Sequence, residues 1–156
     1  MEFLFLFMVV VFCTYVTCIG LKYGILPSIS ESYYVLPKNY KPLFTLFCWA
    51  FAFPAIILGS TPLMFFAGAG ICFVGAAAAF KEKMTKEVHY GGAMVGIICS
   101  QLSIGLDFHF YYINAFFIIT AALIILLKKY LSNTTWWIEI DAFISICMAI
   151  GSKIFL

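Results

Sequence analysis

Six apolar runs, each close to 20 residues long, follow one another along this chain. They cover residues 3–20, 42–58, 63–80, 88–106, 110–127 and 136–155. A helix of about 20 apolar residues crosses the hydrocarbon core of a bilayer and satisfies its own backbone polar groups there. The runs lack the alternating polarity that barrel strands need. The pattern predicts an all-α membrane protein in which residues 1–156 form one domain, a bundle of six transmembrane helices.

The composition argues against a water-soluble fold. Hydrophobic residues make up 65% of the 156 positions and charged residues 10%, whereas soluble domains are about half apolar and one quarter charged. A small domain cannot bury that much apolar surface. The net charge of +2, without a basic patch interleaved with aromatics, gives no indication of nucleic-acid binding. We expect membrane lipid as the partner, with another membrane protein or a homo-oligomer as alternatives.

Eight of the nine lysines lie in alternate connections between the runs. Residues 21–41, 81–87 and 128–135 carry three, three and two of them, and the other two connections carry none. Cytoplasmic loops of membrane proteins are enriched in lysine and arginine. We therefore expect these three connections to be cytoplasmic and both termini to lie outside (N-out/C-out), in a bacterial cytoplasmic membrane.

Small residues recur every four positions on the third and fourth runs. They are Gly68, Cys72 and Ala76 on the third run and Gly92, Gly96 and Ser100 on the fourth. Such spacing lets helix backbones approach closely in lipid. It predicts that these two helices form a tight antiparallel pair. The alternative interpretation is a stripe of small residues that lines a pore.

The first connection is too apolar for a free loop, so we expect it to be structured and packed against the bundle or the membrane interface. It brings Ser30 and Glu31 to the face where His89 opens the fourth run. Serine, carboxylate and histidine together are typical of a hydrolase or transferase, if the base reaches the nucleophile. The alternative is a set of loop caps beside an interfacial histidine. Further ligand-binding candidates on this face are Ser28, Tyr33, Tyr34 and Tyr90.

Polar residues also gather toward the outer end of the fourth and fifth runs. These candidates are Ser103, Asp107, His109 and Asn114. They form either a ligand-binding cluster or a solvated turn whose serines bond back to their own helix. Glu139 and Asp141 begin the sixth run, where an acid can bind a proton or cation. The alternative is interfacial anchoring, with the acids paired to Lys128 or Lys129.

Metal and disulfide sites are not expected. The six cysteines all fall inside apolar runs without a CxxC motif, which is typical of small apolar helix residues. His89 and His109 lie at opposite ends of one helix, roughly 30 Å apart, and cannot easily share an ion. We therefore predict no metal and no cofactor.

The first connection resembles a known family pattern. Pro27-x-Ile29-Ser30-Glu31, then Pro37, then Leu43-Phe44 is similar to the first loop of the Frag/DRAM/Sfk-type six-helix membrane proteins. His89, three residues before Gly92, also resembles that group and related uncharacterised bacterial six-helix families. The resemblance implies a small integral membrane protein with a lipid-related or regulatory role and no established catalysis.

Three functions remain open from the sequence. The leading expectation is a non-enzymatic membrane protein that binds lipid or a partner helix. The alternative is a membrane-embedded hydrolase or transferase that uses Ser30, Glu31 and His89. The third is a proton- or cation-coupled carrier of small solutes that uses Asp107 or Asp141.

Overall fold

A computed structural model describes residues 1–77 and 83–156, which contain helices and no strand. Six long helices correspond to the predicted runs, and their bounds are α1 (Glu2–Tyr23), α3 (Pro42–Gly59), α4 (Pro62–Ala77), α5 (Lys83–Leu102), α6 (Tyr111–Leu126) and α7 (Thr134–Phe155). Residues 78–80 of the predicted third run, and 81–82 of the lysine-rich connection after it, lie outside the described residues. The all-α prediction is confirmed for the part of the chain that is described.

Three short elements complete the chain. The first connection contains α2 (Ser32–Val35) and the 3-10 helix η1 (Lys38–Tyr40), so the predicted structure in this segment is present. The π-helix η2 (Ser103–Asp107) continues α5, where the sequence predicted an unbroken α-helix to residue 106. A π-turn inside a helix changes the direction of the side chains that follow, and such turns are frequent at functional sites.

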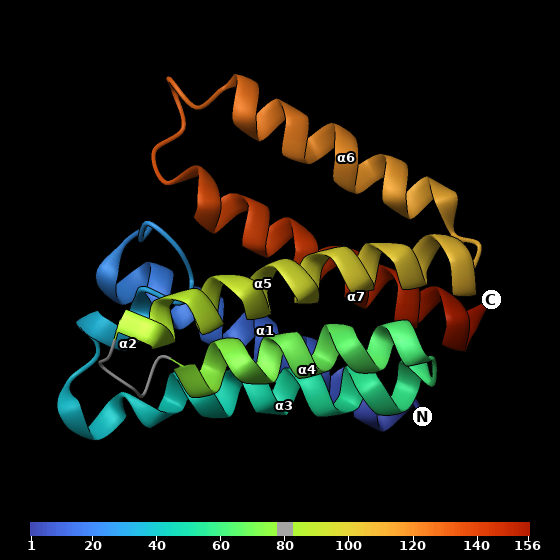
Figure 1. Ribbon diagram of the computed structural model, residues 1–156, viewed down its shortest axis with the longest axis horizontal. Helices are drawn as coiled ribbons and strands as arrows, with labels where there is room; N and C mark the ends of the chain where they lie inside the picture. The colour runs from blue at the N-terminus through green and yellow to red at the C-terminus, as the bar shows by residue number, and fades with distance from the viewer. Residues whose placement is uncertain (78–82) are drawn as a thin grey trace.

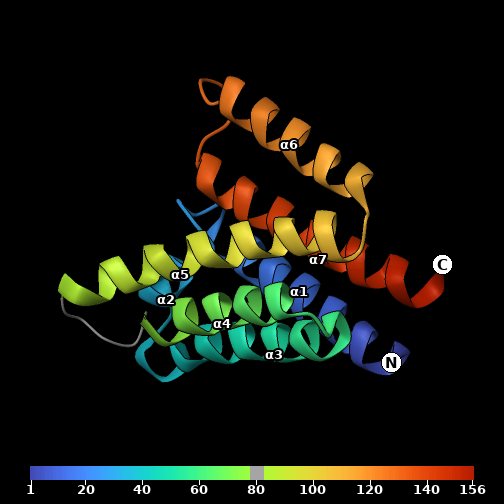
Figure 2. The same cartoon turned by 45° about the vertical axis from the view of Figure 1, so that its right-hand side comes forward.

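The long helices α1, α3, α4, α5 and α7 pack together in one group, and α6 lies at its edge (Figure 1). α3 packs against both α1 and α4, and α4 packs most extensively against α5. α6 lies along α7 and is inclined away from the other helices, as Figure 2 shows. Ile113 is its one fully buried residue among those described in that helix, whereas Ile118, Ile119 and Leu123 are exposed.

Aromatic rings fill the space between α1, α3 and α7. Phe143 of α7 stacks on Phe12 at 5.3 Å between centroids and meets the edge of Phe51 at 4.6 Å. Tyr15 stacks on Phe47 at 4.2 Å. Offset and edge-on ring pairs of this kind add about 1 kcal/mol beyond the area they bury. This cluster holds the first, third and seventh helices at fixed spacing and so defines one wall of the cavity described below.

Glycine contacts confirm the tight pairing of α4 with α5 and the predicted Gly92 and Gly96 on α5, and they correct the contact residue on α4. A Cβ added to Gly70 would lie 2.5 Å from the Gly92 oxygen and 2.6 Å from the Gly96 nitrogen, so these two backbones touch. The predicted stripe on α4 faces α3 instead: a Cβ at Gly68 would collide with Ile56. The reason is helical spacing, because residues two positions apart point to nearly opposite sides of a helix.

Large apolar side chains are exposed on all six long helices, including Leu21 at 85% and Leu126 at 76%. Two segments, Glu2–Tyr23 and Lys38–Gly59, are long and apolar enough to cross a bilayer by length and composition. The helices Pro62–Ala77 and Tyr111–Leu126 are apolar but shorter. Contiguous apolar surface of this extent is uncommon on a monomer in water.

Candidate functional site

The first connection is attached to the bundle at several points. It leaves α1 through Gly24, whose φ of 78° lies in the region that favours glycine. Ile29 is then buried at 2% exposure, and the Asn133 side-chain amide donates to the Ile25 carbonyl over 2.6 Å. At its α2 end, the Tyr15 hydroxyl lies 2.6 Å from the Ser32 hydroxyl. These contacts hold the connection against α1 and the start of α7.

Ser30 and His89 meet, although 59 positions separate them. The Ser30 Oγ lies 3.1 Å from the His89 Nε2, and the serine is 9% exposed. In the neutral tautomer whose Nε2 carries no proton, His89 accepts the hydroxyl proton of Ser30, and in the other tautomer the Nε2–H donates to Ser30. In the first tautomer His89 can take the Ser30 proton.

Ser28 supports this pair. Its Oγ accepts the Glu31 backbone N–H at 3.2 Å and lies 2.9 Å from the Ser30 Oγ. With Ser28 donating its hydroxyl proton to Ser30, the hydroxyl of Ser30 is left to donate to His89. The hydrogen bonds then run in one direction, from Glu31 N–H through Ser28 and Ser30 to the imidazole.

A different carboxylate from the predicted one stands beside this pair. The Glu31 side chain makes no hydrogen bond to His89 within the described residues. The Glu139 Oε2 of α7 instead accepts the Ile29 backbone N–H over 2.5 Å. The sequence left Glu139 as either a proton- or cation-binding acid or an interfacial anchor, and no local signal pointed to its partner 110 positions away. Its place inside an apolar run was the one available clue.

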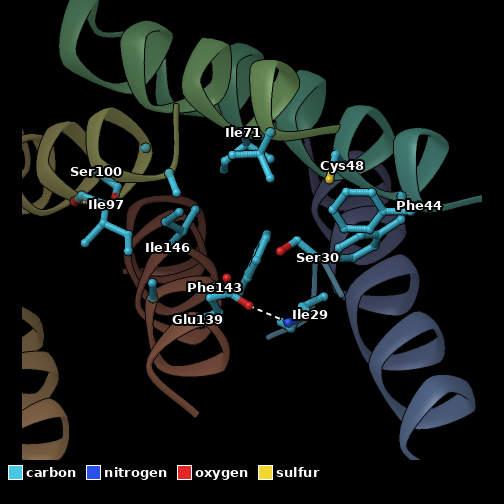
Figure 3. Close-up of a pocket in the computed structure, with 15 residues that line it drawn as sticks. Ile29, Ser30, Phe44, Cys48, Ile71, Ile97, Ser100, Glu139, Phe143 and Ile146 are labelled. Atoms are coloured by element: carbon cyan, nitrogen blue, oxygen red, sulfur yellow. Dashed lines mark hydrogen bonds between the residues drawn. The ribbon is translucent and has the colours of Figure 1, made fainter. Parts of the chain in front are cut away.

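A cavity adjoins these groups (Figure 3). Its volume is about 60 Å³, and it lies between α3, α4, α5, α7 and the first connection, partly open to the outside. The Ser30 hydroxyl points into the space that Ile71, Phe143 and Ile146 border. The other polar lining residues are Glu139 and Ser100, and Ser100 donates to the Ile97 carbonyl of its own helix. The walls are therefore apolar, and the exposed polarity is concentrated at Ser30 and Glu139.

The predicted outer cluster is divided by the structure. Ser103 donates to Asp107 Oδ2 at 2.9 Å, and the Thr61 hydroxyl lies 2.9 Å from the Ser103 Oγ. Because Ser103 has one proton and gives it to Asp107, Thr61 is the donor to Ser103. His109 lies apart and exposed, with its Nδ1 3.3 Å from the Tyr111 hydroxyl.

Asn114 and Asp141 belong to two further contacts along α7. Asn114 donates to the side-chain oxygen of Gln101 at 2.9 Å, and Gln101 donates to Ser145 at 2.8 Å. Asp141 is 5% exposed and accepts a 2.5 Å hydrogen bond from Thr120 of α6. Asp141 and Asp107 thus lie in separate clusters, and the carrier hypothesis stays a prediction.

The three tyrosine candidates lie outside the cavity lining. Tyr34 and Tyr90 are 60% and 58% exposed. Tyr33 faces the opposite side of the first connection, where the Lys41 ammonium lies 5.1 Å from its ring centroid. The cavity therefore brings together Ser30 with His89 beside it, joins Glu139 to them, and leaves the tyrosines out.

Comparison with known proteins gives no homologue from which function could be transferred. The chain matches no protein-family model, no curated protein and no solved structure. The resemblance to the Frag/DRAM/Sfk-type proteins stays a prediction.

Proposed function

We propose that this chain is a six-span membrane protein that takes part of the apolar chain of a lipid into the partly open cavity between α3, α4, α5 and α7. The observation that carries the proposal is the distribution of polarity in that cavity. Its walls are apolar, and Ser30 and Glu139 supply polar groups at one end. A ligand that fits both parts has a hydrocarbon chain and a polar group that accepts or donates hydrogen bonds.

The membrane placement supports this choice. Apolar side chains cover the outer surfaces of the helices, and two segments have full spanning length. α4 and α6 are shorter, and short spans are accommodated by local thinning of the bilayer or by flanking residues. The alternating lysines orient the first connection toward the cytoplasm, with both termini outside. The polar end of the cavity then lies near the inner leaflet.

Native mass spectrometry of the protein released from membranes tests the proposal. We expect the wild-type chain to retain a lipid. Ala93→Leu places three more carbons in the cavity wall and should reduce the lipid-bound fraction about tenfold or more, since overfilling a packed site displaces its contents. Ala122→Leu, the same change on an exposed position of α6, should retain the lipid. A wild-type protein free of lipid, or equal retention in both variants, would reject the proposal.

The Ser30–His89 contact favours one second candidate, a membrane-embedded acyl hydrolase or transferase. In this reaction Ser30 Oγ attacks the ester carbonyl carbon of the bound lipid while His89 takes the hydroxyl proton. His89 returns the proton to the alcohol as the ester bond breaks, and a water or acceptor alcohol then releases the acyl group by the same steps. Glu31 contributes its backbone N–H to Ser28, and in the described part of the chain its carboxylate makes no hydrogen bond to Ser30 or His89.

A fluorophosphonate probe, which reacts with activated serines, separates the two candidates. The enzyme hypothesis expects labelling at Ser30 that is lost in Ser30→Ala and reduced at least a hundredfold in His89→Ala. Ser132→Ala, at an exposed position, is the matched control. Absence of labelling in a protein that retains lipid leaves the binding function and excludes the enzyme.

A further inference from the structure

A second hollow lies on the outer face of α3, away from the cavity. It is lined by Tyr33 and two of the three lysines of the first connection, Lys38 and Lys41, and by Pro42, Thr45, Leu46 and Trp49 of α3. On a helix, positions 45, 46 and 49 point to the side opposite positions 44, 47 and 48, which border the inner cavity. The two sites therefore lie back to back on α3 and share no lining residue.

The end of this groove at the first connection is positively charged. Lys38 is exposed, and Lys41 is held with its ammonium 5.1 Å from the Tyr33 ring centroid. No acidic residue belongs to its lining within the described residues. The contact with the ring orients Lys41 without neutralising it, because a cation over an aromatic face keeps its charge. Two ammonium groups thus face one hollow and favour an anion there.

The other end of the groove, along α3, is apolar. The polar groups of Thr45 and Trp49 there already form hydrogen bonds. Thr45 donates to the Gly75 carbonyl at 2.8 Å, and the Trp49 indole N–H donates to the Cys72 carbonyl at 3.3 Å. Both bonds are directed into the backbone of α4, so the faces left toward the groove are hydrocarbon. Leu46 and Trp49 are 57% and 40% exposed, and Phe53 continues the same side at 53%.

We propose that this groove binds an anionic glycerophospholipid of the cytoplasmic leaflet, with its phosphate at Lys38 and Lys41 and its chains along Leu46, Trp49 and Phe53. The order of charge above hydrocarbon matches the order of phosphate above acyl chain in a bilayer leaflet. A free phosphate or nucleotide would use the lysines and leave the apolar part without a contact. The proposal rests on the membrane placement in the proposed function and is independent of the inner cavity.

Trp49 supplies the probe, in a chain in which Trp136→Phe and Trp137→Phe leave it as the one tryptophan of the three. The full chain is reconstituted in bilayers that contain either brominated phosphatidylglycerol or brominated phosphatidylcholine, and quenching of tryptophan fluorescence is measured. We expect the wild-type protein to be quenched at a lower mole fraction of the anionic lipid. Since each lysine near an anionic lipid strengthens binding roughly fivefold, Lys38→Gln with Lys41→Gln should lower the preference by roughly 25-fold.

The matched control removes the same charge elsewhere. Lys128→Gln with Lys129→Gln changes an exposed lysine pair beyond α6 and should keep the preference. Equal quenching of the wild-type protein by both lipids would overturn the proposal, as would equal loss in the two lysine pairs or displacement of the lipid by inorganic phosphate. Ala93→Leu should retain the preference, so failure of the groove and failure of the inner cavity are read separately.

Discussion

The two ends of the bundle use the same kinds of side chain for different purposes. At the end that carries the termini, Thr61, Ser103 and Asp107 bond to one another, and Lys153 donates to the Leu58 and Gly59 carbonyls at 3.0 and 2.6 Å. At the opposite end Ser30, His89 and Glu139 also form hydrogen bonds, but Ser30 and Glu139 line a cavity. The adjacent space, rather than the residue type, distinguishes a candidate site from a helix cap.

Chain connectivity explains the difference. α3 and α4 are joined by a short turn, so the helix ends converge there and polar side chains are used to satisfy backbone groups. Lys153 does this for α3, because a cation at a helix C-terminus meets unpaired carbonyls and the negative end of the helix dipole. At the other end a long connection and the separated start of α5 (Figure 2) keep the helices apart. Space remains where they do not meet.

The largest expected effect comes from the α4–α5 contact that lies between the two ends. Gly70→Ala would push a methyl group against the Gly92 and Gly96 backbones, which cannot move as a side chain can. We expect about 3 kcal/mol lower free energy of unfolding, with loss of lipid from the cavity, measured by circular dichroism during titration from mild detergent into dodecyl sulfate. Gly91→Ala, with open space around its Cβ, should change stability by less than about 0.5 kcal/mol. Equal stability of the two variants would contradict the close contact.

Lys153→Met should produce the next largest effect. The change leaves the last carbonyls of α3 without a charged donor, and hydrogen bonds to charged groups contribute about 1.5–3 kcal/mol. Because Lys153 is exposed, we expect the free energy of unfolding to fall by about 1.5 kcal/mol in the same titration, with lipid retention unchanged. Lys129→Met is the matched control and should be neutral. Loss of lipid in Lys153→Met would contradict the proposal that only the end with Ser30 and Glu139 takes part in lipid binding.

A pair of serine variants compares the ends directly. Ser103→Ala removes the donor to Asp107 and the acceptor of Thr61, and we expect a loss of about 1–2 kcal/mol without a change in lipid binding. Ser30→Ala should have a smaller effect on stability and should alter the lipid-bound fraction in native mass spectra. If Ser103→Ala altered the lipid-bound fraction and Ser30→Ala did not, the ligand would lie at the end that carries the termini, which would contradict the proposed site.

Glu139→Gln should have the smallest effect. The amide oxygen still accepts the Ile29 N–H, so we expect the free energy of unfolding to change by less than about 1 kcal/mol. Glu139→Ala removes that acceptor and should lower it by about 1–3 kcal/mol. If both variants behave alike, the Ile29 contact does not hold the first connection in place.

Part of the site could be anticipated along the chain. The lysine pattern placed Ser30 and His89 on one face, and the structure joins them by a hydrogen bond. Glu139 was interpreted as a proton- or cation-binding acid or an interfacial anchor, because nothing near it in sequence indicates that its carboxylate accepts the Ile29 N–H. The sequence also did not predict that Gly68 of α4 faces α3 while Gly70 faces α5. Spacing identifies a face of small residues but does not indicate which helix packs against it.

The sequence by itself determined the helical class, the extent of the long helices and the apolar character of their surfaces, because these follow from hydrophobic run length and backbone hydrogen bonding. The tertiary structure alone decided which helices meet, where a cavity remains and which polar groups face it. Contacts such as Ile29 with Glu139 join residues 110 positions apart and depend on how whole helices pack. Local residue patterns carry no information about that distance.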